Sequence, residues 1–167
     1  QDSYSTPVLY AATPIGQVTT NTPLRSPADN YFYNGGIDYA LTPDQVLRVN
    51  LQGSQFNRGN IGVGAQDLVG RAFSTEDSQF GLFVQQNGPI GRRFVLNTRF
   101  SMFRGDSESP SALDEMTVIV NDAFTSGGAQ QRGGTHRRNY WANSDLDYVP
   151  GSHSMRARVG VQGATFG

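Results

Sequence analysis

From Tyr31 onward, hydrophobic and polar residues alternate with a period of two along most of the chain. This alternation predicts β-strands that have one apolar and one polar face. Six runs of about 10–12 residues show it: 31–41, 46–57, 76–86, 93–104, 137–147 and 154–165. Residues 1–30 are rich in Thr, Pro, Ser and Asn and have little periodicity, so we expect an irregular loop or extended segment there.

The connections between these predicted strands alternate between short and long. Tight turns are expected at 42–45, 87–92 and 148–153, where Pro, Asp, Asn and Gly gather. The two long connections, 58–75 and 105–136, are polar and glycine-rich, and 116–120 within the second favours a short additional strand. Outer-membrane barrels have this asymmetry, with tight periplasmic turns at one rim and long extracellular loops at the other.

The two faces of the predicted strands differ in charge. The face that includes Ile37, Val49, Leu82, Phe100 and Val159 carries no charged residue. A charge facing lipid costs roughly 2–4 kcal/mol for Arg at the bilayer midplane, and that cost would produce such a segregation. An antiparallel sheet with a water-soluble core on its apolar side is the alternative explanation.

The opposite face supplies the candidate binding residues, which we place on the wall of a barrel lumen. They are Arg48, Asn50, Arg99, Asn143, Asp145, Asp147, Arg156 and Arg158. The two aspartates share a face, and a hairpin turned near 148–153 would bring the last two arginines opposite them. We therefore expect cross-strand ion pairs rather than a calcium site, which would need further oxygen ligands.

The composition narrows the classes of function. Charged residues make up 16% of the chain, against roughly 25% in typical soluble domains. The absence of cysteine excludes disulfides and thiolate metal sites. His136 and His153 lie in a loop and a turn, where no oriented nucleophile is apparent. Gly62-Val63-Gly64 lacks the third glycine of a nucleotide loop. We expect no enzyme activity, no catalytic residue, no metal site and no cofactor. A net charge of −1 with scattered arginines also predicts no nucleic-acid partner.

Four segments in the same order resemble the barrel region of TonB-dependent receptors, of the acidobacterial type that carries a carboxypeptidase-regulatory-like domain. They are 29–51, 85–99, 122–134 and 144–158. The resemblance covers about residues 29–165, and the ordered set carries it rather than one motif. It implies a 22-stranded barrel in the bacterial outer membrane, filled by a plug domain and importing a nutrient with energy from a TonB complex. It does not extend to a TonB box, plug or regulatory domain, and we expect the chain to be internal to a longer protein.

The fold expected is all-β: an antiparallel up-and-down meander of about six long strands that forms part of a transmembrane β-barrel over 31–167. Its expected role is to supply the wall and extracellular loops of a transporter. The partners implied are outer-membrane lipid, the remaining strands and plug of the parent chain, and the TonB complex through parts outside this chain. A soluble or secreted β-domain that binds carbohydrate or another surface ligand is the alternative, and a passive porin segment is a third. A second sheet covering Val49, Leu82 and Phe100 would favour the soluble domain.

Overall fold

The protein is all-β in a computed structural model that describes residues 2–21, 23–129, 131–151 and 153–167. Its six long strands are β4 (Leu24–Thr42), β5 (Gln45–Ile61), β6 (Phe73–Ile90), β7 (Phe94–Ser109), β10 (Gly133–Tyr148) and β11 (Met155–Phe166). The short elements are β1 (Asp2–Ser5), β2 (Val8–Thr13), β3 (Gly16–Asn21), β8 (Val118–Val120), β9 (Phe124–Ser126) and the 3₁₀ turn η1 (Val69–Arg71). No helix within the described ranges is long and apolar enough to cross a membrane.

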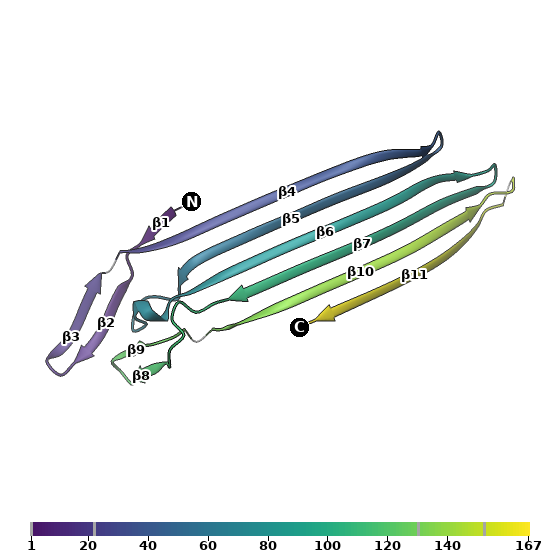
Figure 1. The fold of residues 1–167 in the computed structure, drawn as a ribbon. Helices are drawn as coiled ribbons and strands as arrows, with labels where there is room; N and C mark the ends of the chain where they lie inside the picture. Colours follow the sequence, from purple (N-terminus) through teal and green to yellow (C-terminus); the bar gives the residue numbers. More distant parts are fainter. Residues whose placement is uncertain (1, 22, 130, 152) are drawn as a thin grey trace. The chain divides into compact units, whose positions relative to one another are not determined.

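The long strands form one antiparallel sheet in meander order (Figure 1). The order is β1-β4-β5-β6-β7-β10-β11, with β1 paired only to the start of β4, and the sheet is not closed. The six-strand meander predicted from the periodicity is therefore confirmed. The short and long connections also alternate as expected, because β4–β5, β6–β7 and β10–β11 are joined by brief turns.

The chain divides into two compact units. Unit 1 comprises residues 1–31, 55–78 and 106–135, and unit 2 comprises residues 32–54, 79–105 and 136–167. Five of the six long strands, β4, β5, β6, β7 and β10, contribute residues to both units, whereas β11 lies wholly in unit 2.

Unit 2 consists of strand segments and short turns alone, in a single layer. Its turns are tied together by backbone and side-chain hydrogen bonds: Val149 N–H donates to Arg93 O at 2.8 Å, and Gln45 Nε2 donates to Pro89 O at 2.9 Å. Two tyrosine rings lie over glycines of the neighbouring strand, Tyr33 over Gly53 and Tyr140 over Gly163. An aromatic ring placed over a strand glycine covers backbone that the missing side chain would leave open.

Unit 1 gathers the two long connections and the amino-terminal segment. Backbone bonds join β2 to the first connection, from Tyr10 N–H to Ala65 O at 2.7 Å, and join the two connections, from Leu68 N–H to Thr125 O at 3.0 Å. The buried hydrophobic residues of the described chain, Leu9, Ala72 and Ala123, all lie in this unit. The loops predicted at 58–75 and 105–136 are thus packed on each other.

Several predicted boundaries were wrong. The long strands run 12–19 residues, and the expected loop 58–75 narrows to the stretch between β5 and β6. Residues Asn87–Ile90, predicted as part of a tight turn, belong to β6. The chain reverses after them at Gly91. Its φ of 65° lies in the left-handed region, which glycine adopts at little free-energy cost.

Two other predictions about local structure fared differently. The short strand expected at 116–120 is present as β8, over Val118–Val120. Residues 1–30, expected to be an irregular loop or extended segment, hold β1, the β2–β3 hairpin and the beginning of β4 in their described part. β1 and β3 are mostly polar and β2 is almost entirely apolar, so none of them alternates with a period of two and the periodicity did not reveal them.

Candidate functional site

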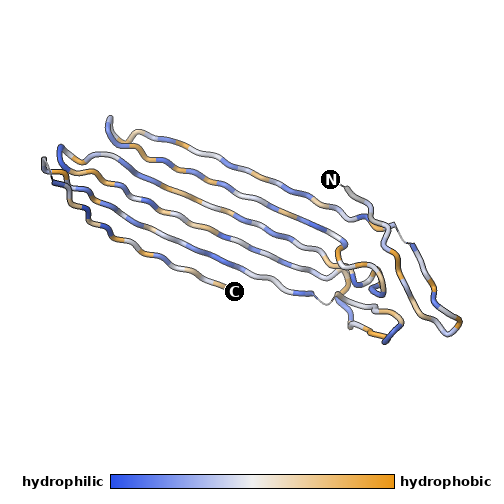
Figure 2. Tube along the Cα trace, turned by 180° about the vertical axis from the view of Figure 1, so that it is seen from behind, coloured by the Kyte–Doolittle hydropathy of each residue, from blue (hydrophilic) through white to orange (hydrophobic). Residues whose placement is uncertain are grey.

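Hydrophilic and hydrophobic stretches follow one another along the long strands (Figure 2). Cross-strand contacts in unit 2 join residues of the same predicted face. On the apolar face, Phe94 stacks on Tyr148 with ring centroids 4.8 Å apart, and Thr98 Oγ1 lies 3.0 Å from Ser144 Oγ. These contacts agree with the two faces that the alternation predicted.

Two ion pairs cross the β10–β11 hairpin on the polar face. Asp145 is opposite Arg158 and Asp147 is opposite Arg156 in the strand register. Arg158 Nε donates to Asp145 Oδ1 at 2.5 Å, and Arg156 Nε donates to Asp147 Oδ1 at 2.5 Å. In both pairs the second guanidinium nitrogen donates to the other carboxylate oxygen. The cross-strand ion pairs predicted from the sequence are confirmed.

A third ion pair joins β4 to β5 on the same face. Arg48 Nε donates to Asp38 Oδ1 at 2.8 Å and Arg48 Nη2 donates to Asp38 Oδ2 at 2.9 Å. Asn50 lies against Gly36, where a Cβ atom would collide with its side-chain oxygen. Both predicted wall residues of β5 therefore contact the neighbouring strand.

The remaining predicted wall residues lie near the middle of β7 and β10. Arg99 contributes to the electrostatic environment of Asp145. Asn143 and Asp145 are 7% and 6% exposed, and within the described structure Asn143 Oδ1 has no hydrogen-bond partner. The eight predicted residues thus occupy one polar face, but as paired or packed groups rather than as one binding cluster.

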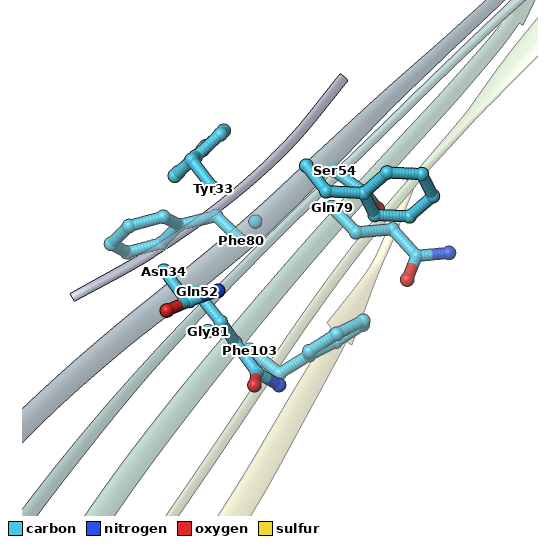
Figure 3. Close-up of a pocket in the computed structure, with 10 residues that line it drawn as sticks. Tyr33, Asn34, Gln52, Ser54, Gln79, Phe80, Gly81 and Phe103 are labelled. Carbon is cyan, nitrogen blue, oxygen red and sulfur yellow. The ribbon is translucent and has the colours of Figure 1, made fainter. Parts of the chain in front are cut away.

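Two open hollows on unit 2 were not singled out by the sequence. One, of about 250 Å³, is lined by residues from β4, β5, β6 and β7, among them Gln52, Gly81 and Phe103 (Figure 3). The other, of about 610 Å³, is lined by residues of β6, β7, β10 and β11, among them Phe83 and Trp141. Phe103 lines both hollows. The sequence contains one sign of these hollows. Phe83, Phe103 and Trp141 fall at positions of the polar face, on three different strands.

The apolar face of unit 2 is uncovered. Ile37 is 71% exposed and Val159 is 70% exposed, and Phe100 is exposed as well. Apart from glycines, the buried residues in the described part of unit 2 are the polar Asn143 and Asp145. This distribution reverses the usual one, in which apolar side chains are buried and charged ones are exposed.

Arg71 organises the long connections of unit 1. Its side chain is 5% exposed and donates to Asp67 Oδ1 at 3.3 Å, to Thr117 Oγ1 at 3.1 Å and to Gly128 O at 2.6 Å. This role could not be predicted from the local pattern of residues, because the partners of Arg71 lie up to 57 positions away.

The histidines and acidic residues offer little chemistry. His136 pairs through its backbone with Gly167, and His153 is exposed in the β10–β11 turn, where the adjacent Ser152 lies outside the described residues. Within the described ranges, no group of three or more histidine or acidic residues is placed to hold a metal ion. No family model, curated protein or solved structure matches the chain.

Proposed function

We propose that this chain forms part of the wall and the extracellular loops of a transmembrane β-barrel, in a TonB-dependent transporter of the bacterial outer membrane. Unit 2 is the membrane-spanning part of this proposal. Unit 1 carries the long connections and corresponds to the extracellular end. The polar face of the sheet faces the barrel interior, and the apolar face contacts lipid.

The reversed burial of unit 2 carries the proposal. A water-soluble antiparallel sheet buries one face against another layer, because exposed apolar area has a free-energy cost in water. Here a single-layer sheet leaves that face bare and buries polar Asn143 and Asp145 instead. Lipid removes the cost of the bare face, whereas water does not.

The strand segments of unit 2 have the length that a bilayer requires. The shortest, 45–54, has ten residues and the longest, 136–148, has thirteen. About 9–11 residues cross a bilayer when the strands are tilted. The stacked Phe94 and Tyr148 lie on the apolar face at the short-turn end, where barrels collect aromatic residues at the membrane interface.

The transport part of the proposal rests on the four segments that resemble TonB-dependent receptors. The alternative, a soluble β-domain that binds carbohydrate, would need a covered hydrophobic core in unit 2. That alternative predicts a second sheet over Val49, Leu82 and Phe100, and the described part of unit 2 contains no such sheet. The open edges of the sheet also fit a barrel that continues beyond this segment, because unpaired edges are otherwise prone to aggregate.

Spin labels on β11 test the membrane-barrel proposal directly. The chain lacks cysteine, so a single cysteine introduced at Val159, Gly160, Val161 or Gln162 is the one thiol of this segment. Each variant is labelled in the full-length protein in liposomes, with any cysteine outside this segment replaced by serine. We expect labels at the two valines to collide with dissolved oxygen, and labels at the other two positions to collide with a water-soluble nickel chelate. A label at the exposed Met116 is the control for full access to water. Equal nickel access at all four β11 positions would contradict the proposal.

A further inference from the structure

The two hollows of unit 2 form one uncharged region. We call it the aromatic–amide strip and define it by Gln52, Phe83, Phe103, Trp141 and Gln162. No residue that lines either hollow is charged. The second hollow, at about 610 Å³, falls within the range of roughly 300–1,000 Å³ for small-molecule sites. The strip is therefore large enough for a ligand and offers it no net charge.

Three aromatic rings of the strip line the second hollow together. They are Phe83 and Trp141, which are 41% and 39% exposed, and Phe103, which also lines the first hollow. Scattered exposed apolar residues are ordinary on a protein surface. Three rings around one hollow, on the polar face of a sheet, instead form a continuous surface on which a flat apolar ligand face can pack.

Side-chain amides lie beside these rings. Gln162 is the register partner of Trp141 across β10–β11. Gln52 Cγ lies 3.4 Å from the position that a Cβ of Gly81 would take, and a ring carbon of Phe83 lies 3.1 Å from it. Because Gly81 has no side chain, Gln52 and Phe83 approach each other closely. Each carboxamide can both donate and accept hydrogen bonds.

Six charged groups of the polar face lie outside the strip and are paired with each other, as Asp38 with Arg48, Asp145 with Arg158 and Asp147 with Arg156. Arg99 also lies outside the linings of the two hollows and contributes to the electrostatic environment of Asp145. An anionic ligand such as nucleic acid would need clustered cations. A ligand suited to the strip is neutral, has an apolar face and carries hydroxyl groups at its rim. Sugar rings have these properties.

We propose that the aromatic–amide strip binds a neutral glycan, with sugar rings packed on Phe103 and Trp141 and hydroxyl groups bonded to Gln52 and Gln162. The inference deepens the proposed transporter function, on which it rests for placing this face inside a barrel. It names the class of ligand that such a barrel would admit.

Calorimetry on the full-length protein in detergent tests this inference. The probes are maltohexaose and cellohexaose, with hexagalacturonate as the charged counterpart of the same length. We expect at least one neutral probe to bind, and Phe103→Ala and Trp141→Ala each to weaken it by about tenfold or more, as loss of a central aromatic contact does. Phe100→Ala is the matched control, because it removes the same ring from the opposite face of β7. It should change the affinity less than about twofold.

A second pair of variants separates lost binding from lost folding. Gln52→Leu and Gln162→Leu keep the size of the side chain and remove its hydrogen bonds, so they should weaken binding while the circular dichroism spectrum stays unchanged. The inference is overturned if neither neutral probe binds, if binding survives both aromatic variants, or if hexagalacturonate binds as tightly. If a plug covers the strip, neither neutral probe binds, which is the first of these outcomes. The spin-label experiment tests the membrane barrel and uses no sugar, so the two proposals can fail separately.

Discussion

Asp145 and Arg158 face each other across the β10–β11 hairpin, and the guanidinium donates to both carboxylate oxygens, at 2.5 and 3.2 Å. The aspartate is 6% exposed, whereas the side chain of Arg158 is 61% exposed. The ion pair therefore joins a carboxylate that is almost buried to a guanidinium that is largely exposed. Asp147 and Arg156 repeat the arrangement nearer the turn, with a more exposed aspartate.

We predict that Arg158→Met destabilises the protein more than Arg156→Met. The first substitution leaves an almost buried carboxylate without its donors, and the second leaves a carboxylate that water can reach. The measurement is the urea midpoint of unfolding in liposomes. Adding Asp145→Asn to Arg158→Met should recover part of the loss, and equal midpoints for the two single variants would contradict the prediction.

We predict that Arg71→Leu loosens the long connections of unit 1. It leaves Gly128 O and Thr117 with fewer hydrogen bonds in a buried setting, at a cost of about 1–3 kcal/mol. Hydrogen exchange within 110–129 should become faster. Arg132→Leu is the control, because its ion pair with Asp114 is exposed on both sides, and it should change stability by less than about 0.5 kcal/mol. Equal rates of hydrogen exchange within 110–129 in the two variants would contradict the proposal that Arg71 holds the long connections together.

We predict that Gly163→Val is destabilising because a Cβ there overlaps the ring of Tyr140. The expected cost is about 1–3 kcal/mol, as for other insertions into occupied space. Tyr140→Ala in the same chain should restore part of the loss by vacating that space. Thermal unfolding of the two single variants and the double variant measures the coupling, and strictly additive effects would show that the ring does not depend on the glycine.

We predict that Val161→Arg impairs assembly in the outer membrane and that Gln162→Arg does not. Val161 is exposed on the apolar face, where an arginine facing lipid costs roughly 2–4 kcal/mol. Its neighbour faces the opposite side of the sheet, since successive side chains of a strand alternate. The amount of heat-modifiable, folded protein in outer-membrane fractions distinguishes the two variants. Equal assembly would show that lipid does not contact Val161.

The ion pairs and the strip differ in how far the sequence could predict them. Asp145, Asp147, Arg156 and Arg158 lie on either side of one tight turn, so alternation and a single hairpin were enough to place them opposite each other. Phe83, Phe103 and Trp141 come from three strands separated by two turns or loops. Their meeting depends on the register of each neighbouring pair, and a shift of one residue would turn a ring to the opposite face.

The sequence by itself determined the six long strands, their uncharged apolar face and the alternation of short and long connections. These features follow from the period of two along the strand and from residues that favour turns, both of which are local. Only the tertiary structure decided where the strands end, how Arg71 joins the long connections, and which aromatic rings share a hollow. Those features depend on hydrogen bonds and packing between residues distant in the chain, for which the local pattern carries no signal.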